Sequence, residues 1–158
     1  METELLRLVS ASPEETEGAG ARTAALARDA GVGFIAMFGD LGAGKTAFAR
    51  GVASVLAPGA RVTSPTYAIV NEYYPNIHDK FTMPLFHFDM YRIESDDDLD
   101  SIDFDSYFDR GMILTEWTEN IIERLPKRYI SVHITKKSET EREIVVKMEE
   151  NADADAWN

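Results

Sequence analysis

One short run of residues restricts the fold of this chain more than any other feature. Gly39-Asp40-Leu41-Gly42-Ala43-Gly44-Lys45-Thr46 matches the pattern G-x-x-x-x-G-K-[ST]. Its glycines let the backbone curl so that successive N–H groups point at phosphate oxygens. In this pattern the Lys45 ammonium reaches the β- and γ-phosphates, and the Thr46 hydroxyl binds Mg²⁺. The run therefore predicts a nucleotide-phosphate loop rather than an ordinary glycine-rich turn.

The residues on either side of this run support that interpretation. Residues 34–38 form a short, continuous apolar run, which is typical of a strand buried on both faces of a parallel sheet. Residues 45–56 predict a helix, which Pro58-Gly59 would end. The N-terminus of that helix adds positive partial charge to a phosphate site. A buried strand, a phosphate loop and a helix in this order predict an α/β fold.

The rest of the chain predicts more alternating strands and helices. Ser12, Pro13 and Glu15 have the spacing of a capped helix start, and the helix would run to about Ala30. Strands are expected at 3–10, 67–73, 85–89 and 112–116, a short helix after Ser95, a helix capped by Thr118 that runs to Arg124, and a closing hairpin at 129–135 and 143–148. These elements predict a P-loop NTPase-like three-layer sandwich with a mostly parallel central sheet and a C-terminal hairpin. Residues 1–150 are expected to form a single domain, followed by a polar tail at 151–158.

Two acidic residues directly follow apolar runs that are expected to be strands. Asp89 follows residues 85–88, and Glu116 follows residues 112–115. Ligands of open α/β sheets bind outside the carboxyl ends of the strands, and P-loop chemistry uses an acid there as a second anchor for Mg²⁺. Either acid alone is also compatible with an ordinary strand end. His87 is expected to be packed or hydrogen-bonded within its strand.

Ser64-Pro65-Thr66 falls in the loop after the predicted phosphate-loop helix. Segments in such loops sense the γ-phosphate in nucleotide switches, and Ser64 and Thr66 offer hydroxyls for this role. A plain turn before a strand explains the same residues, so both interpretations stay open. The guanine-reading motif N-K-x-D is absent from the sequence, which favours ATP over GTP.

Composition and charge exclude several classes of function. The chain has no cysteine, which excludes disulfides, thiolate metal sites and a cysteine nucleophile. Its net charge of −12 would repel a phosphate backbone on average, so contact with RNA or DNA is expected only through a partner. No apolar run approaches the ~20 residues that span a membrane. We expect a cytoplasmic protein without membrane association.

Several strings together resemble the TsaE family, also called YjeE. They are the phosphate-loop run 39–46, Ser64-Pro65-Thr66-Tyr67, His87-Phe88-Asp89-Met90-Tyr91-Arg92 and Glu116-Trp117. Their order and spacing fit the family, and the last three are more specific than the phosphate loop. Ala47 stands where the family often has a second threonine, and Thr118 stands where a proline is common.

The resemblance implies an ATPase that is needed to make N6-threonylcarbamoyladenosine in tRNAs reading codons that begin with A. Members of the family work with the proteins TsaB and TsaD, and TsaD transfers the threonylcarbamoyl group. Hydrolysis of ATP supports this complex over its cycle and is slow without the partners. The tRNA is met only through the complex.

The resemblance also implies roles for individual residues. Lys45 is similar to the phosphate lysine, and Thr46 and Glu116 to the ligands of Mg²⁺. Asp89 is similar to the acid that orients or deprotonates the attacking water. Thr16 falls where the family contacts the nucleotide near its base. The other expected nucleotide contacts are Gly39, Asp40, Leu41, Gly42, Ala43, Gly44, Ser64 and Thr66.

Two other functions share the same phosphate loop. A small-molecule kinase would usually carry a lid with several arginines, yet Arg92 and Arg110 are the only arginines between Arg61 and Arg124. A switch that binds ATP only to dock on a partner would need the same residues as the ATPase. Turnover of ATP is the property that separates these hypotheses.

Overall fold

The computed structural model describes residues 1–39, 44–63 and 69–150. Its elements are β1 (Glu2–Ser10), α1 (Pro13–Asp29), β2 (Phe34–Gly39), α2 (Lys45–Leu56), β3 (Val70–Tyr73), β4 (Leu85–Asp89), α3 (Asp96–Ser101), the 3₁₀ helix η1 (Phe104–Tyr107), β5 (Met112–Glu116), the 3₁₀ helix η2 (Thr118–Arg124), β6 (Arg128–Lys136) and β7 (Arg142–Glu150). The predicted tail at 151–158 lies outside the described residues.

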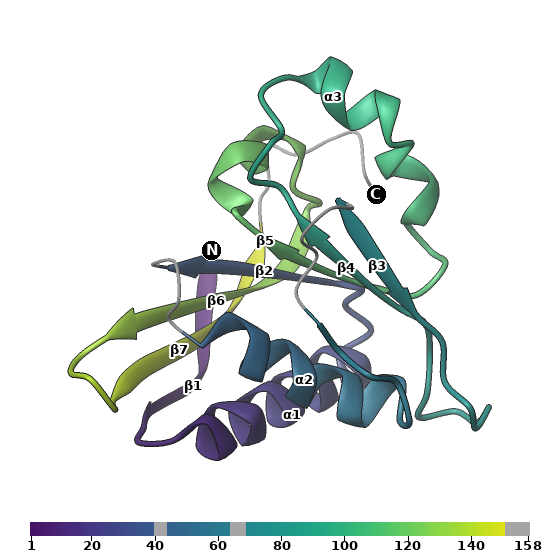
Figure 1. The fold of residues 1–158 in the computed structure, drawn as a ribbon. Helices are drawn as coiled ribbons and strands as arrows, with labels where there is room; N and C mark the ends of the chain where they lie inside the picture. Colours follow the sequence, from purple (N-terminus) through teal and green to yellow (C-terminus); the bar gives the residue numbers. More distant parts are fainter. Residues whose placement is uncertain (40–43, 64–68, 151–158) are drawn as a thin grey trace.

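Within the described residues the strands form one seven-stranded sheet in the order β1-β7-β6-β2-β5-β4-β3 (Figure 1). The central strands β6, β2, β5 and β4 run parallel to one another. β7 and β1 continue one side of the sheet in antiparallel pairs, and β3 pairs antiparallel with β4 on the other. The C-terminal hairpin is therefore confirmed. The expectation of a mostly parallel sheet holds only at its centre, because both edges are antiparallel.

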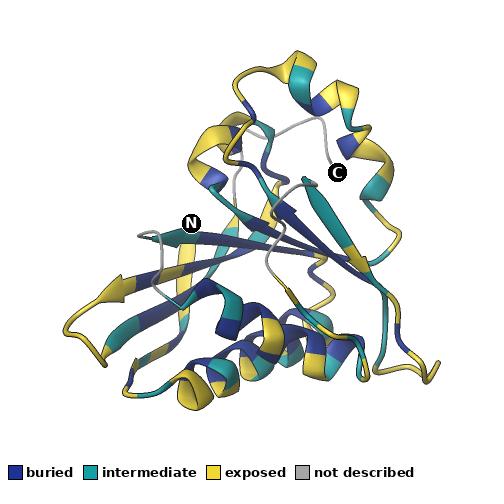
Figure 2. Ribbon diagram, viewed as in Figure 1, coloured by how far each residue is buried: buried dark blue, intermediate teal, exposed yellow. Residues whose placement is uncertain are grey.

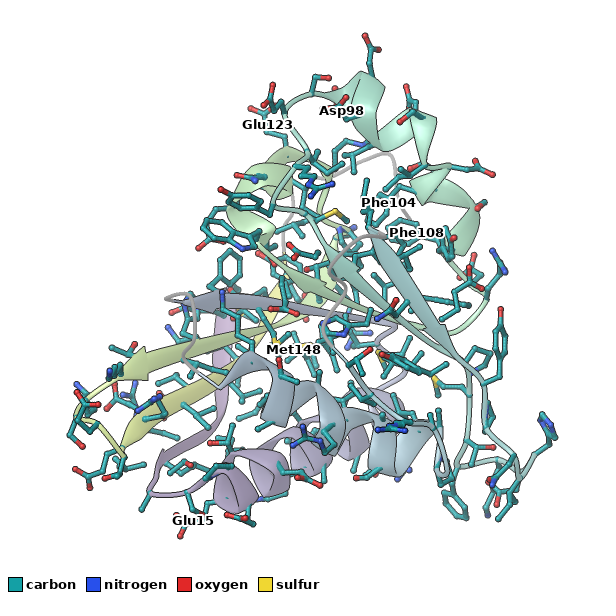
Figure 3. All side chains as sticks on the ribbon, viewed as in Figure 1. Glu15, Asp98, Phe104, Phe108, Glu123 and Met148 are labelled. Carbon is teal, nitrogen blue, oxygen red and sulfur yellow. The ribbon has the colours of Figure 1, made fainter. Side chains whose placement is uncertain are left out.

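Helices cover both faces of this sheet. α1 and α2 lie side by side on one face, over an apolar cluster that includes Met37, Phe48 and Leu114 (Figure 1). α3, η1 and η2 cover the other face through a second cluster that includes Phe88 and Phe104 (Phe104 is labelled in Figure 3). The buried central strands separate the two clusters (Figure 2). This layering is consistent with the expected three-layer arrangement.

The start of α1 matches its sequence pattern. Ser12 is the N-cap, and its Oγ accepts a hydrogen bond from the Glu15 backbone N–H at 3.1 Å. Glu15 Oε1 in turn accepts from the Ala11 N–H at 2.9 Å, one residue before the cap. The two bonds satisfy N–H groups that a helix start leaves without partners.

Within the described residues, no helix has the length and apolar character needed to span a membrane.

Two expected elements differ from the structure. Thr118 does not cap an α-helix: Trp117 holds the cap position of η2 with φ 55°, and Thr118 is buried. Its hydroxyl donates to the Met37 carbonyl at 2.8 Å, because a buried hydroxyl needs a partner and the neighbouring strand β2 supplies one. The strand expected at 67–73 begins at Val70, and residues 67 and 68 of it lie outside the described part.

α1 and α2 cross in close contact over the sheet. A Cβ on Gly51 of α2 would collide with the Glu17 carbonyl oxygen of α1. Backbone atoms cannot move aside as a flexible side chain can, so any larger residue would push the two helices apart. Gly18, one residue along α1 from Glu17, is exposed, and a Cβ there would meet nothing within 4 Å.

These two glycines provide a matched test of the helix crossing. Gly51→Ala is expected to lower the free energy of unfolding by about 1–3 kcal/mol, the usual cost of overpacking. Gly18→Ala is expected to raise it by about 0.5–1 kcal/mol, because alanine is the better helix former. Urea unfolding of both variants checks this. Equal effects of the two substitutions would contradict the close crossing.

Candidate functional site

The carboxyl ends of three parallel strands meet at one edge of the sheet. β2 ends at Gly39, and the last residues of β4 and β5, Asp89 and Glu116, lie directly opposite each other in register. The Met90 N–H donates to the Glu116 carbonyl at 3.0 Å and extends this pairing by one residue. The structure therefore brings together the two acids that the sequence singles out.

The start of α2 lies at the same edge. Gly44 is its N-cap with φ 92°, a conformation that residues with a Cβ rarely adopt. Lys45 follows, is 5% exposed, and has its Nζ 5.4 Å from the centroid of the Trp117 ring. Because Trp117 directly follows Glu116, the Lys45 ammonium lies near the end of β5. The indole face attracts the ammonium group there.

Thr46 and Thr16 both lie close to this helix start. Thr46 is partly exposed in the first turn of α2. Thr16 is buried in α1, and its Oγ1 lies 2.6 Å from Ser10 Oγ. A Cβ built on Gly44 would lie 3.5 Å from the Thr16 Cγ2, so α1 touches the end of the glycine-rich run.

Part of the expected site is not described by the structure. The loop residues and the hydroxyl-bearing segment after α2 lie outside the described residues; they are Asp40, Leu41, Gly42, Ala43, Ser64 and Thr66. Their expected contacts with nucleotide stay predictions.

A pocket of about 380 Å³ opens beside Gly44. The start of α1 lines one side, with Ser12 and Thr16, and the turn between β6 and β7 lines the other, with Thr140 and Arg142. This volume lies within the range of small-molecule sites. Its lining includes Gly44 and Ala47, so the pocket borders the start of α2.

The environment of Asp89 favours its neutral form. Burial raises the pKa of the Asp89 carboxyl, and the negative charge of Glu116 raises it further. The hydrogen bond that Asp89 Oδ1 accepts from the Tyr91 N–H, at 3.0 Å, acts in the opposite direction. Perturbed carboxyls of this kind concentrate at functional sites.

Glu116 has a partner within the sheet. His87 Nε2 lies 2.6 Å from Glu116 Oε2, and the side chains are 0% and 12% exposed. His87 is thus both packed and hydrogen-bonded, as expected. The sequence alone did not indicate that its partner would be the candidate Mg²⁺ ligand.

The residues present fit a Mg²⁺ ion that also binds nucleotide phosphates. Within the described residues, no three His, Asp or Glu side chains converge as a metal site of their own. Mg²⁺ in nucleotide sites is commonly held by one or two protein oxygens together with waters and phosphate oxygens. A Thr46 hydroxyl and a Glu116 carboxylate are donors of this type.

Sequence reasoning missed three residues that border the site. Trp117 was part of a family string, but nothing indicated that it would lie under Lys45. Thr140 and Arg142 lie between the two strands of the predicted hairpin, yet only the order of the strands places that connection beside α1. The antiparallel pairing of β6 with β7, and of β7 with β1, places the β6–β7 turn beside the pocket.

Comparison with known proteins identifies relatives that cover most of the chain. The family model described as "Threonylcarbamoyl adenosine biosynthesis protein TsaE" matches residues 10–144. A Bacillus subtilis protein named tRNA threonylcarbamoyladenosine biosynthesis protein TsaE is 38% identical over 140 residues, which is 88% of this chain and 83% of that protein. A Treponema pallidum protein of the same name is 30% identical over 142 residues, 89% of this chain and 99% of that protein.

A solved structure has the same fold. The crystal structure of Bacillus subtilis YdiB superposes with a TM-score of 0.66 at 31% sequence identity. The match covers 93% of this chain and 86% of the YdiB chain. The α/β fold with its mixed sheet is thus shared with an experimentally determined relative.

The raised pKa of Asp89 predicts how pH affects stability. A carboxyl with a raised pKa stabilises the fold below its ordinary pKa of about 3.9, and this contribution is lost as pH rises through the raised value. The ionised Asp89 carboxylate therefore lowers the free energy of unfolding of the nucleotide-free protein at pH 7. Asp89→Asn should unfold at a higher temperature than the parent at pH 7, and the difference should shrink towards pH 4. Thermal melts at both pH values check this, and a less stable variant at pH 7 would contradict it.

Proposed function

The chain belongs to the TsaE family of threonylcarbamoyl adenosine biosynthesis proteins, and we propose that it is a Mg²⁺-dependent ATPase of that pathway. It works in the cytoplasm with TsaB and TsaD in modifying tRNAs that read codons beginning with A. The acidic surface, with a net charge of −12, supports contact with tRNA only through these partners.

In this proposal, residues at the start of α2 bind the phosphates of ATP. The Lys45 ammonium leaves the Trp117 ring and pairs with the β- and γ-phosphates, and the N-terminal end of α2 adds its partial positive charge. Gly44, with φ 92°, turns the backbone into the helix at this point. The base of ATP occupies the pocket beside Thr16, between α1 and the β6–β7 turn.

Hydrolysis uses the two strand-end acids in different roles. Thr46 and Glu116 hold Mg²⁺, which when bound neutralises negative charge on the β- and γ-phosphate oxygens. Asp89, opposite Glu116, orients a water molecule for in-line attack on the γ-phosphate and accepts its proton. Lys45 stabilises the charge that spreads over the transferring group.

One observation carries this proposal. Asp89 and Glu116 end neighbouring parallel strands in register, at the edge where Lys45 begins α2. A protein that only bound phosphate would need the lysine and the helix start. Hydrolysis needs a further acid in addition to these. Asp89, a partly buried carboxyl with a raised pKa beside the proposed metal ligand Glu116, is an acid of that kind.

The proposal predicts a specific defect when Asp89 is removed. The parent should hydrolyse ATP slowly with Mg²⁺ and faster once TsaB and TsaD are added. Asp89→Ala should lower the stimulated rate by about 10²–10⁴-fold, the usual contribution of a general base, and should still bind ATP. A phosphate-release assay and calorimetric ATP binding measure the two properties.

Each alternative function has its own outcome in this experiment. ATP binding without turnover by the parent, even with TsaB and TsaD, would identify a docking switch. Phosphate transfer to an added metabolite or nucleoside would identify a kinase. Normal hydrolysis by Asp89→Ala would remove Asp89 from the mechanism.

The proposal also predicts that one lysine dominates nucleotide affinity. Lys45→Ala should weaken ATP binding roughly 10- to 100-fold, because it removes charge-assisted hydrogen bonds to phosphate. Lys147→Ala is the control, because Lys147 Nζ donates to Glu2 Oε1 at 3.0 Å in the β1–β7 pair. Calorimetric titration with ATP compares the two variants. Equal affinities would show that Lys45 does not bind phosphate.

A further inference from the structure

His87 is an unusual residue for the middle of a buried strand. Its side chain is 0% exposed, and Nε2 lies 2.6 Å from Glu116 Oε2 on the neighbouring strand. Burying an imidazole costs free energy unless its polar atoms are paired, and a leucine or valine would fill the same space without that cost. The hydrogen bond to Glu116 therefore offsets part of the cost of burying the His87 imidazole.

The sheet register sets this contact. His87 lies opposite Leu114 on β5, and Glu116 lies two residues further along. Because side chains two apart project from the same face of a strand, His87, Asp89, Leu114 and Glu116 all face the α1–α2 layer. The imidazole reaches diagonally across the strand pair to the carboxylate.

The hydrogen-bond pattern assigns the tautomer of the ring. Among the described residues, the Nδ1 atom of His87 is buried and has no hydrogen-bond partner. A proton on Nδ1 would be a buried donor without an acceptor, so the proton belongs on Nε2, where Glu116 accepts it. In this tautomer the imidazole is the donor and the Glu116 carboxylate is the acceptor.

This arrangement suits a carboxylate that has to bind a cation. A carboxylate has about four lone-pair sites, so one hydrogen bond to Oε2 leaves Oε1 able to bind Mg²⁺. The bond fixes the rotation of the side chain before the metal arrives. Partners of this kind around a ligand typically change metal affinity by about 10–100-fold.

We infer that His87 is a positioning residue that holds Glu116, through its Nε2–H, in the orientation that binds the nucleotide-associated metal. This inference rests on the proposed function, since it needs Glu116 to be a metal ligand. His87 touches neither nucleotide nor water in this role. It acts only through the carboxylate.

Two substitutions separate positioning from packing. His87→Phe keeps an aromatic ring of similar volume and removes the donor, whereas His87→Gln keeps an N–H donor near the position of Nε2. The probe is Mn²⁺, followed by electron paramagnetic resonance in the presence of saturating ADP. ADP affinity in EDTA serves as the control for an intact phosphate site.

The positioning role predicts a donor-dependent loss of metal affinity. His87→Phe should bind Mn²⁺ about 10–100-fold more weakly than the parent, and His87→Gln should stay within about threefold of it. ADP affinity in EDTA should be the same in all three proteins. Unchanged Mn²⁺ affinity in His87→Phe, or equal losses in both variants, would overturn the inference and leave His87 as a packing residue.

A measurement on the unsubstituted protein keeps the inference testable if His87→Phe fails to fold. Nitrogen-15 NMR of the imidazole should show a proton on Nε2 and none on Nδ1. A proton on Nδ1 would overturn the assignment. A parent protein that binds neither ADP nor Mn²⁺ would overturn the proposed function itself, whichever tautomer the NMR spectrum shows.

Discussion

The backbone hydrogen bonds that join β2, β5 and β4 in parallel are the constraint on which the rest of the structure depends. They place every carboxyl end at one edge, so residues far apart in sequence meet there without a long loop to carry them. Asp89 and Glu116 come together for this reason, and the helix that follows β2 begins beside them. The antiparallel strands at both edges extend the sheet without changing that arrangement.

The sequence allowed the central part of this arrangement to be predicted, because the signals there are local. The apolar runs before Asp89 and Glu116 and the Ser12 cap each depend on neighbours within a few residues, and the structure agrees with them. The glycine-rich motif is also a local signal, but its residues 40–43 lie outside the described part of the chain. Thr118 was misjudged for the opposite reason. It has the residue type of a helix cap, but its hydroxyl is satisfied by the Met37 carbonyl, a partner from another strand.

The features that could not be predicted all depend on which strands become neighbours. The β6–β7 turn reaches the pocket only because β7 pairs with β1, which leads into α1. The His87–Glu116 bond requires β4 and β5 to be adjacent in one particular register, and a shift by one residue would turn the imidazole to the other face. No pattern within a single strand carries that information.

The close crossing of α1 and α2 has a consequence for the spacing of the residues that the two helices carry. Thr16 of α1 borders the pocket, and Lys45, the lysine proposed to bind phosphate, begins α2. Because the Gly51 backbone lies against the Glu17 carbonyl, main-chain contact sets the separation of the two helices at this point. The spacing of Thr16 and Lys45 is therefore a property of two packed backbones, which a change of side-chain rotamer does not alter.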